Sequence, residues 1–233
     1  MRRGDEREVS GNRFSDRLYR AAQQVWESSH RHPFLTELRD GTLDPKRFIY
    51  YLRQDYVYLI DFAKMFALGG AKARDLETMG KFAELFHSTL NVEMELHRRY
   101  AERFGLSREE LAATVPSPTT IAYTKYMLDA AHNGSLAELV AALLPCMWSY
   151  REIGRAFARV PGALDHPLYR EWILMYSSDE FGELTDWCID LIDSLAEGLP
   201  ERELAVLEER FVVASKFEYL FWDMAYREEE WPV

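Results

Sequence analysis

Apolar side chains recur at intervals of three and four residues along most of this 233-residue chain, and that spacing constrains the fold more than any other feature. Because an α-helix turns once in about 3.6 residues, the pattern gathers apolar side chains on one helical face. No run of alternating β-branched and polar residues indicates a half-buried strand. We therefore predict an all-α fold, a single-domain helical bundle over residues 13–233.

Capping signals set the expected helix boundaries. Asp44 precedes a proline and so suits the N-cap of a long helix. Two S-x-x-E sequences, beginning at Ser107 and Ser135, match the capping box that opens a helix. From these signals and the apolar spacing we expect helices over residues 14–30, 45–69, 72–104, 107 onward, 119–132, 135 onward, 167–176, 179–198 and 200–226.

The composition is that of a globular protein, with 48% hydrophobic and 29% charged residues. The formal net charge is −11 and no run of Lys or Arg is longer than a pair, which argues against DNA or RNA as a partner. Cys146 and Cys188 lack the C-x-x-C spacing of zinc and redox sites, so we expect no disulfide framework. We expect Cys188 to be a packing residue.

The N-terminus and the apolar segments indicate where the protein works. The opening residues, MRRGDEREVSGNR, are charged and lack the apolar region of a signal peptide. The longest apolar stretch, LVAALLPCMW, is far shorter than the roughly 20 residues of a membrane span. We expect a cytoplasmic protein that does not enter a membrane, in which residues 1–12 form a disordered extension.

Three of the predicted helices each carry one polar misfit on an apolar face: Asp55, Cys146 and Glu218. Cys146 follows Pro145, which removes a main-chain hydrogen bond and should kink the helix near Leu144. A carboxylate costs several kcal/mol to bury without a partner. Two acids in one core therefore indicate either internal pairing or a ligand site between helices.

The chemistry of these misfits suits catalysis. An acid among aromatic side chains, such as Glu218, should have a raised pKa and can exchange protons near neutral pH. Cys146 is a candidate nucleophile, and Asp55 is a candidate acceptor for a donor group of the ligand. Converging tyrosines would give flat walls for a planar ring, and the candidates are Tyr58, Tyr123, Tyr150 and Tyr176. For each residue the alternative is an ordinary core position.

A metal site is a second reading of one segment. Glu93 and His97 lie four residues apart and so share a helix face, with His87 further back. Metal-binding bundles use a second such pair on another helix, and the sequence has none. We therefore predict no metal ligands, and we expect Glu93 to face solvent or to cap a local network.

Eight short segments, in order along the chain, resemble those of one known family. They are HPF (32–34), DGTL (40–43), RQDYVYL (53–59), FAK (62–64), EMELH (93–97), PSPT (116–119), ALLPCMWSYREIG (142–154) and FEYLFWDMAY (217–226). From about Phe14 to Trp231 the chain is similar to the thiaminase II (TenA) family of aminopyrimidine aminohydrolases. The resemblance implies a haem-oxygenase-like all-helical fold.

The resemblance also implies a role for each misfit. Cys146 would be the nucleophile that attacks the carbon next to a ring nitrogen, and Glu218 would protonate the ring. Asp55 would accept hydrogen bonds from the amino-pyrimidine edge. Tyr58 would lie close to the reacting group, and the other pocket tyrosines match Tyr123, Tyr150 and Tyr176. Relatives without this cysteine form a separate group, so Cys146 places the chain with the cysteine type.

The implied reaction converts 4-amino-5-aminomethyl-2-methylpyrimidine to the hydroxymethylpyrimidine and ammonia, as in thiamin salvage, and the same chemistry cleaves thiamin. The resemblance implies no cofactor, and it implies a homotetramer that binds only a small-molecule aminopyrimidine or thiamin. Two other functions stay open. One is a regulatory module that binds a pyrimidine without turnover, and the other is a metal-dependent oxygenase of the same fold that uses His87, Glu93 and His97.

Overall fold

The computed structural model describes residues 13–233, and it confirms the predicted all-α, single-domain class. The extension predicted over residues 1–12 lies outside the described residues. The helices are α1 (Phe14–His30), α2 (Pro33–Arg39), α3 (Pro45–Lys72), α4 (Leu76–Ser88), the π-helical turn η1 (Thr89–Glu93), α5 (Met94–Arg103), α6 (Arg108–Ala112), α7 (Pro118–Asn133), α8 (Leu136–Ala158), α9 (Arg170–Tyr176), α10 (Asp179–Ala196) and α11 (Glu201–Arg227). Within residues 13–233, no helix has the length and apolar character needed to cross a membrane.

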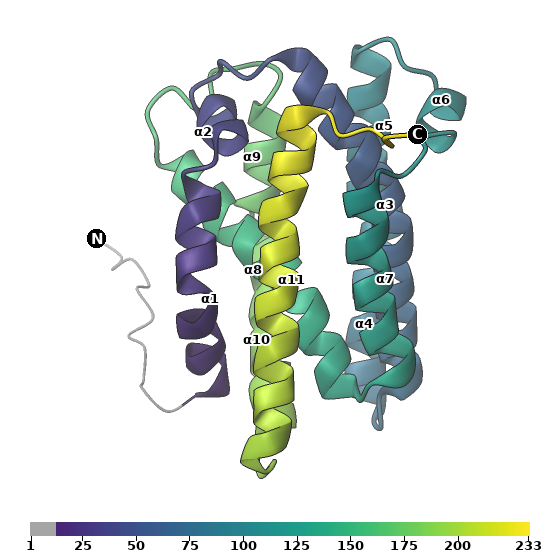
Figure 1. The fold of residues 1–233 in the computed structure, drawn as a ribbon, viewed down its shortest axis with the longest axis vertical. Coiled ribbons are helices and arrows are strands. Elements are labelled where there is room, and N and C mark those ends of the chain that lie inside the picture. Colours follow the sequence, from purple (N-terminus) through teal and green to yellow (C-terminus); the bar gives the residue numbers. More distant parts are fainter. Residues whose placement is uncertain (1–12) are drawn as a thin grey trace.

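The bundle is built around its three longest helices, α3, α8 and α11 (Figure 1). α11 packs against α8 and α1, and it also reaches α7 and α3. On the other side α3 packs along α4 and α7, while α8 is flanked by α9 and α10. The apolar stripes predicted on α3, α8 and α11 all face this shared interior. The three polar misfits of the sequence are therefore carried by helices that pack against one another.

The predicted capping residues do cap helices. The Lys46 amide donates to Asp44 Oδ1 over 2.9 Å, which fixes the start of α3. Both capping boxes form, one at Ser107 before α6 and one at Ser135 before α8. The start of the helix that carries Cys146 is therefore set by the local sequence.

The single helix predicted over residues 72–104 is wrong. α3 runs on to Lys72, and α4 starts only after Asp75, whose side chain accepts from the Thr78 amide over 2.8 Å. Further along, the five-residue π-turn η1 separates α4 from α5. There the Asn91 side chain donates to the His87 carbonyl over 3.0 Å and so competes with the main-chain bonds of an α-helix.

Helix α8 runs without interruption through Pro145. Because proline has no N–H, the carbonyl four residues earlier loses its helical donor at this point. The kink near Leu144 stays a prediction. Every residue of α8 from Leu139 to Leu144 is fully buried, so the helix forms the centre of the bundle.

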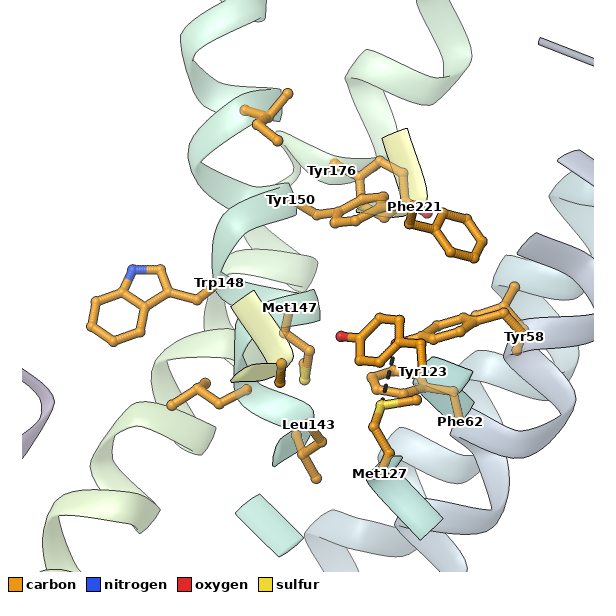
Figure 2. Close-up of a cluster of buried hydrophobic side chains, with 14 of the residues drawn as sticks. Tyr58, Phe62, Tyr123, Met127, Leu143, Met147, Trp148, Tyr150, Tyr176 and Phe221 are labelled. Carbon is orange, nitrogen blue, oxygen red and sulfur yellow. Dashed lines mark hydrogen bonds between the residues drawn. The ribbon is translucent and has the colours of Figure 1, made fainter. Parts of the chain in front are cut away.

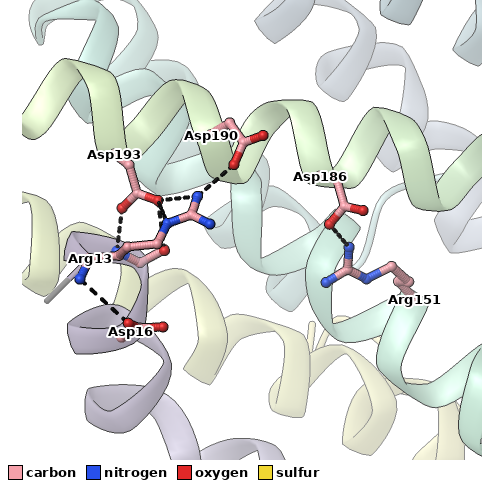
Figure 3. Close-up of polar contacts among 7 residues, drawn as sticks. Arg13, Asp16, Arg151, Asp186, Asp190 and Asp193 are labelled. Atoms are coloured by element: carbon pink, nitrogen blue, oxygen red, sulfur yellow. Dashed lines mark hydrogen bonds and ion pairs between the residues drawn. The ribbon is translucent and has the colours of Figure 1, made fainter. Parts of the chain in front are cut away.

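Ion pairs fasten α10 to its neighbours (Figure 3). Arg13 donates from Nε to Asp193 over 2.7 Å, and its Nη2 lies 2.5 Å from Asp190. Near the middle of α10, Arg151 of α8 donates to Asp186 over 2.6 Å, and this arginine is only 6% exposed. Buried arginines need such partners. These contacts join the start of α1 to the C-terminal part of α10, and α8 to its middle.

Candidate active site

A cavity of about 570 Å³ opens between α3, α4, α5, α8, α9 and α10. Polar and aromatic side chains line its inner part, among them Asp55, Tyr58, Glu93, Cys146, Tyr150 and Tyr176. Its mouth is rich in acids, with Glu84, Glu171, Glu180 and Glu183 beside Lys81 and Arg99. Such a concave site with a few polar groups at its end is typical of small-molecule pockets.

Five of the seven predicted site residues line this cavity, and the other two lie next to it. Glu218 and Tyr123 are not among the lining side chains, but both are buried and the Tyr123 hydroxyl donates to Glu218 Oε1. The Cys146 thiol lies close enough to Tyr58 and Glu218 to affect the pKa of each. The nucleophile candidate therefore lies between the cavity and the buried acid.

Aromatic rings from five helices meet around this point (Figure 2). Tyr58 of α3 lies 5.2 Å from Tyr123 of α7 and 5.5 Å from Phe221 of α11, measured between ring centroids. Tyr150 of α8 and Tyr176 of α9 make an edge contact at 4.7 Å. These rings give the flat walls that a planar heterocycle requires. Phe221 was not among the predicted site residues, because a phenylalanine on an apolar stripe looks like core.

Burial favours the neutral forms of two groups near Tyr58, the carboxyl of Glu218 and the thiol of Cys146. Burial raises the pKa of Glu218 to about 8, and the charge of Asp55 adds to that effect. Burial and the charge of Glu218 raise the pKa of Cys146 well above its usual value, although the Tyr58 hydroxyl opposes the shift. A thiol beside a protonated acid can react only when a ligand accepts a proton.

Asp55 is the centre of a second polar group. Its Oδ2 lies 2.6 Å from His97 Nε2 and accepts from the Tyr51 hydroxyl over 3.2 Å. The other ring nitrogen of His97 lies 2.9 Å from the Glu93 carbonyl. Burial lowers the pKa of His97, but the bond to Asp55 and its charge outweigh that effect and raise it. Sequence reasoning did not assign Tyr51 or His97 to the site.

Glu93 faces the cavity and not bulk solvent, contrary to one of the two expectations for it. It accepts from the Tyr176 hydroxyl over 2.8 Å, and burial together with the charge of Asp55 raises its pKa to about 7. The metal reading also required His87, but that side chain is exposed and contacts Asn91. In the described part of the chain, no three His, Cys, Asp or Glu side chains form a set that could hold a metal ion.

This geometry can be compared with known proteins. The model of the TENA/THI-4/PQQC family matches residues 19–228. The chain belongs to this family. The expected resemblance is therefore confirmed at the level of the family. The cysteine type remains a prediction that depends on Cys146.

Relatives within the TENA/THI-4/PQQC family are similar over almost their whole length. An aminopyrimidine aminohydrolase of Halalkalibacterium halodurans is 53% identical, and the match covers 94% of this chain and 97% of the relative. One of Helicobacter pylori with the same name is 40% identical over 91% of this chain and 98% of its own. Both have names that describe hydrolysis of an aminopyrimidine.

Solved structures confirm the fold. A TenA homologue from P. horikoshii superposes with a TM-score of 0.84 at 33% identity and covers 92% of this chain and 99% of its own. A domain from Shewanella denitrificans described as having a heme oxygenase-like fold gives a TM-score of 0.73 at 16% identity, with 91% and 92% covered. The expected haem-oxygenase-like class is confirmed.

Proposed function

We propose that this protein is an aminopyrimidine aminohydrolase of the cysteine type, which replaces the exocyclic amine of an aminomethylpyrimidine with hydroxyl. The observation that carries the proposal is the position of Cys146, which lines the cavity together with Asp55 and lies close to the buried Glu218. The names of the two relatives support the same reaction. Thiamin salvage is the metabolic setting in which its product is used.

The first step joins Cys146 to the substrate ring. Glu218 gives its proton to the ring nitrogen, and the thiol gives its own proton to the resulting carboxylate as sulfur bonds to the adjacent ring carbon. The electron pair of the carbon–nitrogen double bond moves onto that nitrogen. The ring of this adduct is uncharged, and its 4-amino group is conjugated with the carbon that bears the protonated aminomethyl substituent.

The second step breaks the carbon–nitrogen bond. The 4-amino nitrogen pushes electrons through the ring, and the exocyclic ammonium departs as ammonia, leaving a methylene and a positively charged amino group. Water then adds to the methylene and loses a proton, the electrons return, and the Cys146 thiolate leaves as the ring nitrogen gives up its proton. Asp55 would accept hydrogen bonds from the amino group while that group is positively charged.

The size and charge of the cavity support substrates larger than one ring. A pyrimidine occupies only part of the 570 Å³, so the outer part can hold a bulkier leaving group such as the thiazolium of thiamin. The acidic side chains at the mouth favour a cationic group over an anionic one. Both the aminomethyl group and the thiazolium are cations.

An assay that measures ammonia from aminomethylpyrimidine, formamide from its formylated form and thiazole from thiamin tests the proposal. We expect turnover by the wild-type protein, and none by Cys146→Ser, which should still bind the pyrimidine. Cys188→Ser is the matched control, because Cys188 is buried in α10 beside Met147, with its Sγ 3.6 Å from the methionine sulfur. Unchanged hydrolysis by Cys146→Ser would exclude the nucleophile role.

Saturable pyrimidine binding without release of ammonia or thiazole by the wild-type protein would favour the regulatory module instead. The cytoplasmic location remains a prediction from the N-terminal sequence, and the homotetramer remains a prediction from the family. Native mass spectrometry of the purified protein would test the assembly state directly.

A further inference from the structure

The contact between His97 and Asp55 requires a shared proton. The Glu93 carbonyl can only accept, so His97 must donate to it from Nδ1 over the 2.9 Å separation. A neutral imidazole would then have a lone pair on Nε2, which lies 2.6 Å from Asp55 Oδ2. Two acceptors at that distance repel, so a second proton must lie between them. The pair is therefore either an imidazolium with a carboxylate or a neutral imidazole with a carboxylic acid.

We propose that His97 is a positioning residue of this site, which as an imidazolium holds Asp55 ionised and fixes the direction of its carboxylate. The inference rests on the proposed function, since it concerns the side chain that would bind the amino edge of the pyrimidine. Both known donors, His97 and Tyr51, bind Oδ2. Within residues 13–233 no side chain or amide donates to Oδ1, which leaves that oxygen for the ligand.

The chemistry of the second step explains why the charge of Asp55 matters. The 4-amino group of the substrate becomes positively charged as ammonia departs, and a carboxylate stabilises that charge more than a carboxylic acid does. Asp55 is only 3% exposed, so little water reaches its carboxylate to stabilise the negative charge. His97, which is 1% exposed, is the group that can do so.

Other titratable groups near the pair do not supply this counter-charge. The acids Glu93 and Glu218 and the thiol of Cys146 all act on Asp55 as present or potential negative charges. The tyrosines around it are neutral and come from α3, α8 and α9: Tyr51, Tyr150 and Tyr176. Among the groups that face Asp55, only His97 can carry a positive charge.

A measurement that needs no activity tests the protonation state. Nitrogen-15 NMR of the imidazole rings, assigned with His97→Gln, reports whether His97 carries both protons. We expect the wild-type His97 to remain doubly protonated through neutral pH, and to become neutral at the same pH in Asp55→Asn, where the counter-charge is gone. A neutral His97 in the wild-type protein would overturn the proposal, as would an unchanged signal in Asp55→Asn.

A second measurement tests the consequence for turnover. In His97→Gln the amide can still donate to Asp55, but it carries no charge, so the buried carboxylate binds a proton more readily. We expect kcat/KM to fall roughly tenfold to hundredfold at neutral pH, with the acidic limb of its pH profile moved to higher pH and part of the loss recovered there. His97→Leu also removes the hydrogen-bond donor, so its kcat/KM should be lower than that of His97→Gln at every pH.

The exposed His87, in the last turn of α4 and two residues before η1, gives the matched control. His87→Gln should retain the wild-type profile. If kcat/KM of His97→Gln fell equally at every pH and the acidic limb of its pH profile did not move, the role of His97 would be structural. That result would overturn the proposal. If the wild-type protein releases neither ammonia nor thiazole from any aminopyrimidine, the proposed function fails, but the NMR result on the proton still decides whether His97 is charged.

Discussion

Gly154 of α8 lies directly against the backbone of Tyr176 in α9. A methyl group added at residue 154 would come within 2.6 Å of the Tyr176 carbonyl carbon and within 2.8 Å of the Ser177 nitrogen. Both are backbone atoms, so no side-chain rotation relieves the overlap. We expect Gly154→Ala to separate α9 from α8 and to move the Tyr176 ring away from the cavity.

The expected loss is about 1–3 kcal/mol in the free energy of unfolding, together with reduced ammonia release. Gly80→Ala in α4 is the matched control, because nothing lies within 4 Å of a methyl group there. That change should stabilise the protein by about 0.5–1 kcal/mol. Chemical denaturation of Gly154→Ala and Gly80→Ala measures both changes in stability. Equal stability of the two alanine variants would contradict the close approach of α8 and α9.

The pH dependence of turnover should report on Glu218. Since its pKa is about 8, Glu218 carries the proton that the ring nitrogen requires at neutral pH. We expect kcat/KM, which reports the free enzyme, to fall as pH rises through about 8, and Glu218→Gln to lower kcat/KM by about 100-fold or more without this limb. Initial rates at low substrate concentration across the pH range give the measurement. A wild-type rate that increases through the same range would exclude Glu218 as the proton donor.

The same group should make stability depend on pH. The folded protein keeps the Glu218 proton up to about pH 8, whereas the unfolded chain releases it near the ordinary value of 4.5. The folded state then binds more protons between these values, so stability is full below about 4.5 and decreases as pH rises to about 8. Glu218→Gln should reduce this decrease, leaving the smaller share from Glu93. If the unfolding free energies of the wild-type protein and of Glu218→Gln changed with pH in parallel, this assignment to Glu218 would be contradicted.

Two tyrosine–glutamate bonds of equal length allow a matched comparison. Tyr176 donates to Glu93 in the cavity over 2.8 Å, and Tyr226 donates to Glu37 far from it over 2.8 Å. Phenylalanine at either position should cost about 1 kcal/mol of stability. Only Tyr176→Phe should change KM or kcat, because only that bond borders the ligand. An equal effect of both changes on activity would show that Tyr176 acts through stability alone.

Much of the fold could be predicted because its signals are local. Asp44, Ser107 and Ser135 satisfy amide groups within three residues of themselves, so their roles can be read from neighbouring letters. The helix α2 was missed because seven residues make less than two turns and show no complete apolar stripe. The π-turn was missed because it depends on a side chain that competes for main-chain bonds.

The site was partly visible for a different reason. Asp55 and Glu218 stand out because an acid on an apolar stripe must be satisfied by something outside its own helix. His97 could not be assigned in the same way, since the carboxylate that it contacts is 42 residues away. Its spacing of four residues from Glu93 suggested a metal site instead. Tyr51 looks like any aromatic core residue until its hydroxyl is placed against Asp55.

The π-turn η1 also bears on how the length of the chain can vary beside this site. A π-turn accommodates one more residue than an α-helical turn, and each residue of an α-helix rotates the chain by about 100°. Deleting one residue from Thr89–Glu93 would let this turn close as an ordinary α-helical turn, so α5 would keep nearly the same rotation relative to α4. His97 would then still face Asp55 although the chain had become one residue shorter. Among homologous sequences, a one-letter gap at this point should therefore be compatible with the histidine–aspartate pair.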